Sequence, residues 1–260
     1  MTTRNLQPSQ MKTVLIIGSA PDAVRAREFD ATRLSAIVAI NNAWRIRDDW
    51  SHLIYPEDFA DENKPAKGVG HAFVEFDQFV PANNAYGGIV YAGGTMAFTA
   101  AYWVLHALRP DIIAFIGCDM IYEPEANGTH FYGNGDADPL RDDPTLQSLE
   151  AKSNRLLWKA YQQNCVCLNL SLKVQSRLTF DRLDASALQH DLSAPYRMGM
   201  DKLARRIDGT TCETAETAER EFDVFVENGD YWNARIPLDA SNLATIDQLW
   251  LNAVSSVAAD

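Results

Sequence analysis

The chain of 260 residues contains few cysteines and no long apolar run. Its four cysteines are Cys118, Cys165, Cys167 and Cys212, and the one-residue gap between Cys165 and Cys167 differs from the two-residue gap of zinc and redox pairs. No stretch approaches the roughly 18 apolar residues of a membrane-spanning helix, and the run Val14–Ile17 is too short for a signal peptide. We therefore expect reduced thiols in a cytoplasmic protein without a membrane span.

Basic residues are also scarce. The chain has 23 Lys and Arg against 35 Asp and Glu, which gives a formal net charge of −12. Such a charge repels polyanions, so we expect no nucleic-acid partner, although a local pocket can still hold a phosphate group. The 47% of hydrophobic residues is enough for a sizeable core and excludes a disordered chain.

Short apolar runs alternate with amphipathic segments along the chain. We expect strands at 13–17, 35–40, 52–55, 111–116 and 165–168, and helices from Pro21, over 95–108, from Asp143-Pro144 and over 243–257. This order predicts an α/β fold with a Rossmann-like, doubly wound, mainly parallel sheet. The expected domains are a nucleotide-binding domain at 12–180 with a lid at 120–142, and a small C-terminal appendage at 181–260. Residues 222–226 fit a strand or the end of a helix equally well.

Ligands of open α/β sheets bind at the carboxyl ends of the strands, and four small or polar segments fall there. They are Gly18-Ser19-Ala20-Pro21-Asp22, Asn41-Asn42, Gly93-Gly94-Thr95 and Gly117-Cys118-Asp119. The glycine-bearing turns lead into expected helices, whose free N–H groups can bind a phosphate. Each segment also fits a structural role, as a tight turn or a helix cap. The dinucleotide fingerprint and the Walker loop are both absent from the sequence.

A polar loop of about twenty residues follows Asp119, which is long for a connection between two elements. It contains His130, the histidine best placed to act as a general base, with Tyr122 and Tyr132 nearby. A structural role for this histidine is the alternative. The acidic residues of the loop could bind Mg²⁺, or form a solvated surface with a helix cap; they are Asp136, Asp138, Asp142 and Asp143. We expect no resident metal.

The order of these motifs resembles that in the bacterial lipooligosaccharide sialyltransferases, glycosyltransferase family forty-two. The matching segments, within residues 12–180, are Val14–Asp22, the strand end with Asn41, Gly93-Gly94-Thr95 before a helix, and Phe115–Asp119 with Tyr122. The related 6-hydroxymethylpterin pyrophosphokinase-like proteins share the first turn. The resemblance implies a nucleotide-binding site with contacts from Gly18, Ser19, Ala20, Asn41, Gly93, Gly94 and Thr95. Pro21, Asn42 and Asp119 lie in the same strand-end segments, and we expect them to contribute to the site as well. It also implies that Tyr122 and Tyr132 stabilise a leaving phosphate.

The resemblance implies a transferase that uses a nucleotide-activated donor, with a sugar nucleotide as substrate rather than a bound cofactor. One departure concerns the base. The family has two histidines in an H-x-x-x-H spacing, and the second performs the chemistry, whereas here His130 is followed by Asn134. Two alternatives therefore stay open: a Mg²⁺-dependent pyrophosphokinase of the pterin type, and a nucleotide- or phosphosugar-binding protein without catalysis. The sequence does not identify the nucleotide base, the acceptor or the oligomeric state. A homo-oligomer is compatible with it.

Overall fold

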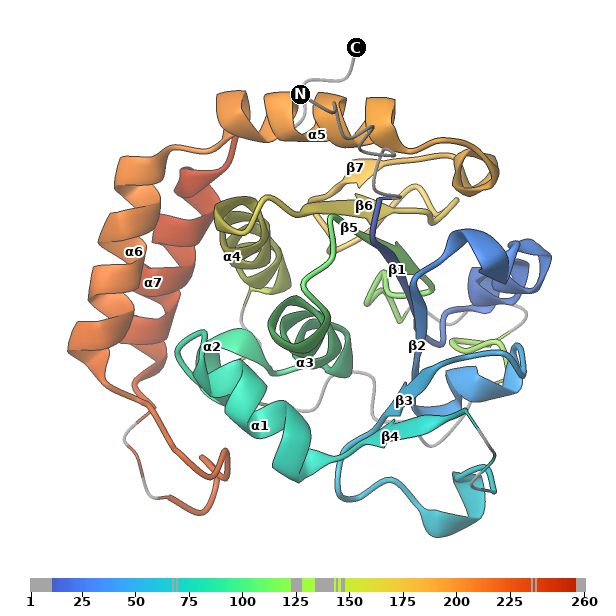
Figure 1. Ribbon diagram of the computed structural model, residues 1–260. Helices are drawn as coiled ribbons and strands as arrows, with labels where there is room; N and C mark the ends of the chain where they lie inside the picture. Colours follow the sequence, from blue (N-terminus) through green and yellow to red (C-terminus); the bar gives the residue numbers. More distant parts are fainter. Residues whose placement is uncertain are drawn as a thin grey trace, which may run out of the picture.

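The computed structural model describes residues 11–66, 68, 70–122, 128–133, 143, 145, 148–234, 236 and 238–255. Seven parallel strands form a sheet in the order β4-β3-β2-β1-β5-β6-β7 (Figure 1). The strands are β1 (Thr13–Ile17), β2 (Ala36–Ile40), β3 (His52–Ile54), β4 (Ala72–Val74), β5 (Ile112–Ile116), β6 (Val166–Asn169) and β7 (Asp181–Arg182). This arrangement confirms the predicted Rossmann-like α/β fold.

The centre of the sheet is formed by β1, β2 and β5. Every residue of these three strands is buried, which explains their unbroken apolar sequences. The chain runs outward from β1 to β4, returns to β5 on the other side of β1, and then runs outward to β7. The direction therefore reverses between β1 and β5, and this is the position at which parallel α/β sheets bind their ligands.

Helix α3 (Met96–Trp103) lies close to the centre of the molecule beside the sheet (Figure 1). Thr95 caps its first turn by accepting a hydrogen bond from the backbone N–H of Phe98, and the helix continues as a π-helical segment over Val104–Leu108. Residues Ala97–Trp103 are all buried, because neighbouring elements cover every side of the helix. The predicted helix over 95–108 is confirmed.

Helix α4 (Leu149–Gln162) begins later than the sequence predicts. Ser148 is its N-cap, since the Ser148 hydroxyl accepts a hydrogen bond of 3.1 Å from the N–H of Ala151. Asp143 instead accepts from the N–H of Thr145 at 2.8 Å and from the hydroxyl of Tyr231. The prediction of a helix start at Asp143-Pro144 is therefore wrong, because α4 begins at Leu149 with Ser148 as its N-cap. The apolar spacing of this segment also predicts that Leu146, Leu149, Leu156, Leu157 and Ala160 are buried. The last four are buried in α4, and Leu146 lies outside the described residues.

The segment after β1 also differs from the expected α-helix, since Pro21–Glu28 is a 3₁₀-helix. Its buried residues Ala23 and Ala26, followed by buried Phe29, repeat every three positions. This spacing matches the three residues per turn of a 3₁₀-helix, and it places all three side chains on the same face.

Further helices and 3₁₀ turns complete the described part of the chain. They are η2 (Ala31–Arg33), η3 (Asn41–Arg45), η4 (Asp61–Asn63), α1 (Phe76–Asn84), α2 (Ile89–Ala92), η7 (Ala185–Gln189), α5 (Ser193–Arg206), α6 (Gly209–Phe222) and α7 (Ala240–Ala253). Residues 222–226 contain the end of α6 followed by irregular chain, not a strand. Within the described residues, every helix is too short or too polar to cross a membrane.

Residues beyond 180 continue the sheet and cover the helices beside it. Strand β7 pairs with β6, and α6 and α7 lie side by side next to α4 (Figure 1). Backbone hydrogen bonds connect the start of α6 to the end of α7. The N–H of Asp208 donates to the carbonyl of Ala253 at 2.9 Å, and the N–H of Ser255 donates to the carbonyl of Arg206 at 3.0 Å. The predicted helix over 243–257 corresponds to α7, and Val257 lies outside the described residues. A separate appendage at 181–260 stays a prediction.

Candidate functional site at the carboxyl edge of the sheet

The turns after β1 and β5 lie in direct backbone contact. The N–H groups of Gly18 and Ala20 donate to the carbonyls of Ile116 and Gly117, at 2.8 and 3.0 Å. A Cβ atom on Gly18 would lie 2.2 Å from the carbonyl oxygen of Gly117. Packing alone therefore requires glycine at position 18, and the N–H groups of Gly18 and Ala20 are already used within the protein. A role of this turn in phosphate binding stays a prediction.

The segment Gly117–Met120 connects this first turn to the start of α3. The hydroxyl of Thr95 lies 3.4 Å from the sulfur of Met120, and Gly94 has a left-handed φ of 94°. The first turn and the Gly93-Gly94-Thr95 turn thus border the same four residues. These two glycine-bearing turns, which the sequence assigns to a single site, lie on either side of one short segment that carries Asp119.

Two carboxylates meet next to this segment. Asp119 is only 1% exposed, and its Oδ2 accepts a hydrogen bond of 2.6 Å from the hydroxyl of Ser171, which follows β6. Asp22 lies against the same loop, since its Oδ2 accepts from the N–H of Leu172 at 3.4 Å. Burial raises the pKa of Asp22, and the charge of Asp119 raises it further. The Oδ1 atoms of both carboxylates are buried and have no hydrogen-bond partner among the described residues.

Ser171 is a residue of this site that sequence reasoning missed. It is oriented by Asn169, the last residue of β6, whose side-chain oxygen accepts a hydrogen bond of 2.9 Å from the N–H of Ser171. The available signal was the position of Ser171 just beyond a buried strand. Its hydrogen bond to Asp119 forms because β5 and β6 are neighbours in the sheet. The residues around Ser171 in the sequence do not indicate which strand lies beside β6.

Asn41 and Asn42 follow β2, the next strand of the sheet, and begin the 3₁₀ turn Asn41–Arg45. Asn41 adopts a left-handed φ of 51°, a conformation that asparagine accepts more readily than most residues. The side-chain oxygens of both residues are buried and have no partner within the described part of the chain. The ends of β1, β2 and β5 thus carry four unpaired buried oxygen atoms, all of them hydrogen-bond acceptors.

The loop with His130 is attached to the first turn. The N–H of Phe131 donates to the carbonyl of Ser19 at 2.9 Å, and His130 and Gly133 exchange two backbone hydrogen bonds of 3.2 and 3.0 Å. The His130 ring stacks on Tyr132, with ring centres 5.0 Å apart, and lies 6.0 Å from the ring of Tyr122. Three predicted catalytic residues are therefore neighbours in space, beside the predicted nucleotide site.

His130 is 4% exposed, and its Nδ1 lies 2.8 Å from the hydroxyl of Thr129. Burial lowers the pKa of His130, so the ring is neutral at pH 7, the protonation state that a general base requires. Asn134, Asp136, Asp138 and Asp142 lie outside the described residues. Within the described chain, no three His, Cys, Asp or Glu side chains are grouped as metal ligands.

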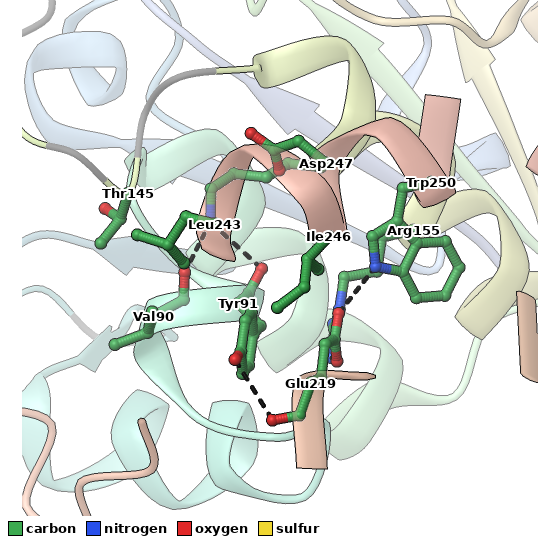
Figure 2. A pocket seen from close by; sticks show the side chains of 10 residues that line it. Val90, Tyr91, Thr145, Arg155, Glu219, Leu243, Ile246, Asp247 and Trp250 are labelled. Atoms are coloured by element: carbon green, nitrogen blue, oxygen red, sulfur yellow. Dashed lines mark hydrogen bonds and ion pairs between the residues drawn. The ribbon is translucent and has the colours of Figure 1, made fainter. Parts of the chain in front are cut away.

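A second polar region lies away from the sheet edge, between α2, α4, α6 and α7 (Figure 2). Its cavity of about 20 Å³ has room for roughly one water molecule. The ammonium of Lys152 donates to the carbonyls of Val90 at 2.7 Å and Tyr91 at 3.3 Å. Burial lowers the pKa of Lys152 to about 8 and raises that of Asp247 to about 6.

The same region contains a buried ion pair. The Nε and Nη2 atoms of Arg155 donate to the two carboxylate oxygens of Glu219, at 2.7 and 2.8 Å. The indole N–H of Trp250 also donates to Glu219, at 2.7 Å (Figure 2). This cavity is too small for a substrate. Its groups join α6 and α7 to α4, and through Lys152 they hold α2, the helix that precedes Gly93.

Comparison of the chain with protein-family models, with curated proteins and with solved structures finds no match. The resemblance to the sialyltransferases therefore stays an interpretation of the sequence motifs. The function has to be inferred from the residues of the site itself.

Proposed function

We propose that the protein is a transferase that binds a nucleotide-activated donor, a sugar nucleotide, at the carboxyl edge of the sheet. The observation that supports this most directly is the group of four buried oxygens on Asp22, Asn41, Asn42 and Asp119, which have no hydrogen-bond partner among the described residues. An unpaired buried acceptor costs about 1–3 kcal/mol, and a ligand that donates hydrogen bonds removes this cost. The hydroxyl groups of ribose and of a sugar are such donors, and the side-chain oxygens of Asn41 and Asn42 are the acceptors that we propose for them.

His130 provides the second part of the argument, because a neutral imidazole borders this edge. In the proposed reaction an acceptor hydroxyl attacks the anomeric carbon of the donor sugar, and its proton passes to His130. The bond between the anomeric carbon and the phosphate oxygen breaks, and the electron pair stays on the nucleotide. The hydroxyls of Tyr122 and Tyr132 stabilise the charge that develops on the departing phosphate.

The test combines binding with turnover. Thermal-shift measurements against CMP, UDP, GDP and ATP should identify one nucleotide that stabilises the protein by about 2.7 kcal/mol at a hundredfold excess over its Kd. His130→Ala should reduce turnover by at least about 10²-fold and leave nucleotide binding unchanged. The matched control is His106→Ala, since His106 lies on the exposed side of the α3 extension. Full turnover by the His130 variant would exclude the assigned base.

A Mg²⁺-dependent pyrophosphokinase is the second candidate, and the paired carboxylates Asp22 and Asp119 support it. Transfer of a diphosphate group from ATP to a hydroxyl group of a small heterocycle such as a pterin uses metal ions to neutralise charge on the phosphates. This candidate predicts consumption of ATP with release of AMP, whereas glycosyl transfer releases the nucleotide of the donor. Tight binding of one nucleotide with neither product would instead identify a binding protein without catalysis.

A further inference from the structure

The proposed function creates an electrostatic problem at the site. A nucleotide donor carries negatively charged phosphates, yet Asp22 and Asp119 both lie against Ser171-Leu172 at the carboxyl edge, and the charge of Asp119 raises the pKa of Asp22. Among the described residues, no lysine or arginine forms an ion pair with either carboxylate. Buried negative charge without compensation is costly, and a bound phosphate would add to it.

Two arginines near this edge, Arg25 and Arg182, donate to backbone carbonyls. Arg25 donates to the carbonyl of Leu170 at 3.0 Å, and Arg182 donates to the carbonyls of Ser171 at 2.7 Å and Val174 at 3.2 Å. These contacts fix the shape of the loop after β6. The charge of Arg25 lowers the pKa of Asp22, but burial and the charge of Asp119 outweigh it and raise that pKa. A cation bound between the two carboxylates would neutralise the pair.

The hydrogen bonds at the pair leave one face of each carboxylate free. Ser171 gives its single hydroxyl proton to Oδ2 of Asp119, and its oxygen accepts from the N–H of Lys173 at 3.1 Å. The Oδ2 atom of Asp22 accepts a hydrogen bond of 3.4 Å from the N–H of Leu172, and Asp22 also interacts with the side chain of Ser171. The Oδ1 atom of Asp119 is unpartnered on a side chain that is 99% buried, and that of Asp22 is likewise buried and unpartnered.

We propose that Asp22 and Asp119 bind a divalent cation of the Mg²⁺ type through their free Oδ1 atoms, and that a phosphate of the nucleotide completes its coordination. Mg²⁺ prefers oxygen ligands, keeps several waters, and is commonly held by one or two carboxylates together with substrate phosphates. Two carboxylates are therefore sufficient, although no larger group of metal ligands occurs in the described chain. The inference rests on the proposed function, because the phosphate is that of the bound donor.

The experiment uses Mn²⁺ as the probe and the whole chain as the protein. Electron paramagnetic resonance counts free and bound Mn²⁺ for the wild type, Asp22→Asn, Asp119→Asn and Asp48→Asn. Asp48 is an exposed residue before β3, at the opposite edge of the sheet, and so controls for the loss of one charge. We expect one site in the wild type and in the Asp48 variant, and at least tenfold weaker binding in the other two.

Both site substitutions keep the volume of the side chain, and circular dichroism confirms folding. If Asp119→Asn fails to fold, Asp22→Asn carries the test, because Asp22 is only partly buried. Wild-type binding of Mn²⁺ no tighter than that of Asp22→Asn would overturn the cation site. Equal nucleotide affinity in EDTA and in Mg²⁺ would also overturn it and would leave the proposed function intact. Absence of nucleotide binding under both conditions would overturn the proposed function, while the Mn²⁺ titration would still decide the cation site.

Discussion

Replacing Arg155 with methionine should destabilise the protein by about 3–5 kcal/mol, the usual cost of leaving one partner of a buried ion pair alone. The side chains of Arg155 and Glu219 are only 2% and 7% exposed. The substitution removes both hydrogen bonds to Glu219, the 2.9 Å bond to the Tyr102 hydroxyl and the bond to the Tyr86 carbonyl. Glu219 would then keep Trp250 as its side-chain donor, with an uncompensated charge in the interior.

Urea denaturation followed by tryptophan fluorescence measures this cost. For a chain of this size, it corresponds to a decrease in Tm of roughly 6–20 °C. The control is Arg177→Met, which removes an exposed arginine paired with Glu150 at 2.8 Å; the two side chains are 43% and 34% exposed. Such surface pairs contribute about 0–1 kcal/mol. Equal losses in the two variants would refute the argument that burial determines the cost.

Three further predictions concern other sites. Gly18→Ala should cost about 1–3 kcal/mol, because the added Cβ would lie 2.2 Å from the carbonyl oxygen of Gly117; unchanged stability in urea would contradict this packing. Burial raises the pKa of Asp247 from 3.8 to about 6, so the folded state retains a proton that the unfolded chain releases, and stability should fall as the pH rises from about 4 to 6. Relative to Asp247→Asn, the wild type should lose about 1–2 kcal/mol over that range, and a constant difference between the two would disprove it. Because burial lowers the pKa of His130 from 6.5, kcat/KM should rise with pH through a midpoint below 6.5; a midpoint above that value would exclude His130 as the base.

The sequence predicts the centre of the fold because the relevant patterns are local. Unbroken β-branched and aliphatic runs at β1 and β5 indicate strands covered on both faces, and the glycines before Thr95 mark the start of α3. The same reasoning missed α1, α2, β4 and α5. Strand β4 has only three residues, too few for its alternation to be distinguished from that of a loop.

The site is predictable only in part, since it depends on contacts between distant segments. The strand ends carry Asp119 and Asn41 in recognisable positions, but the pairing of Asp119 with Ser171 spans 52 residues. Lys152 and Arg155 show a further limit. Their charge predicts an exposed face of α4, yet both are buried because α6 and α7 cover that face. Their partners, Val90 and Glu219, come from segments that a local pattern cannot relate to α4.

The buried pair of Arg155 and Glu219 also constrains the time course of synthesis. The two residues are 64 positions apart in the chain, an interval that translation at about 5–20 residues per second covers in roughly 3–13 s. Before residue 219 is added, the nascent chain comes to contain all seven strands and α4, but the guanidinium of Arg155 still lacks its carboxylate. Water must solvate this guanidinium until α6 emerges from the ribosome. Water is therefore excluded from the layer of helices beside the sheet only when translation is almost finished.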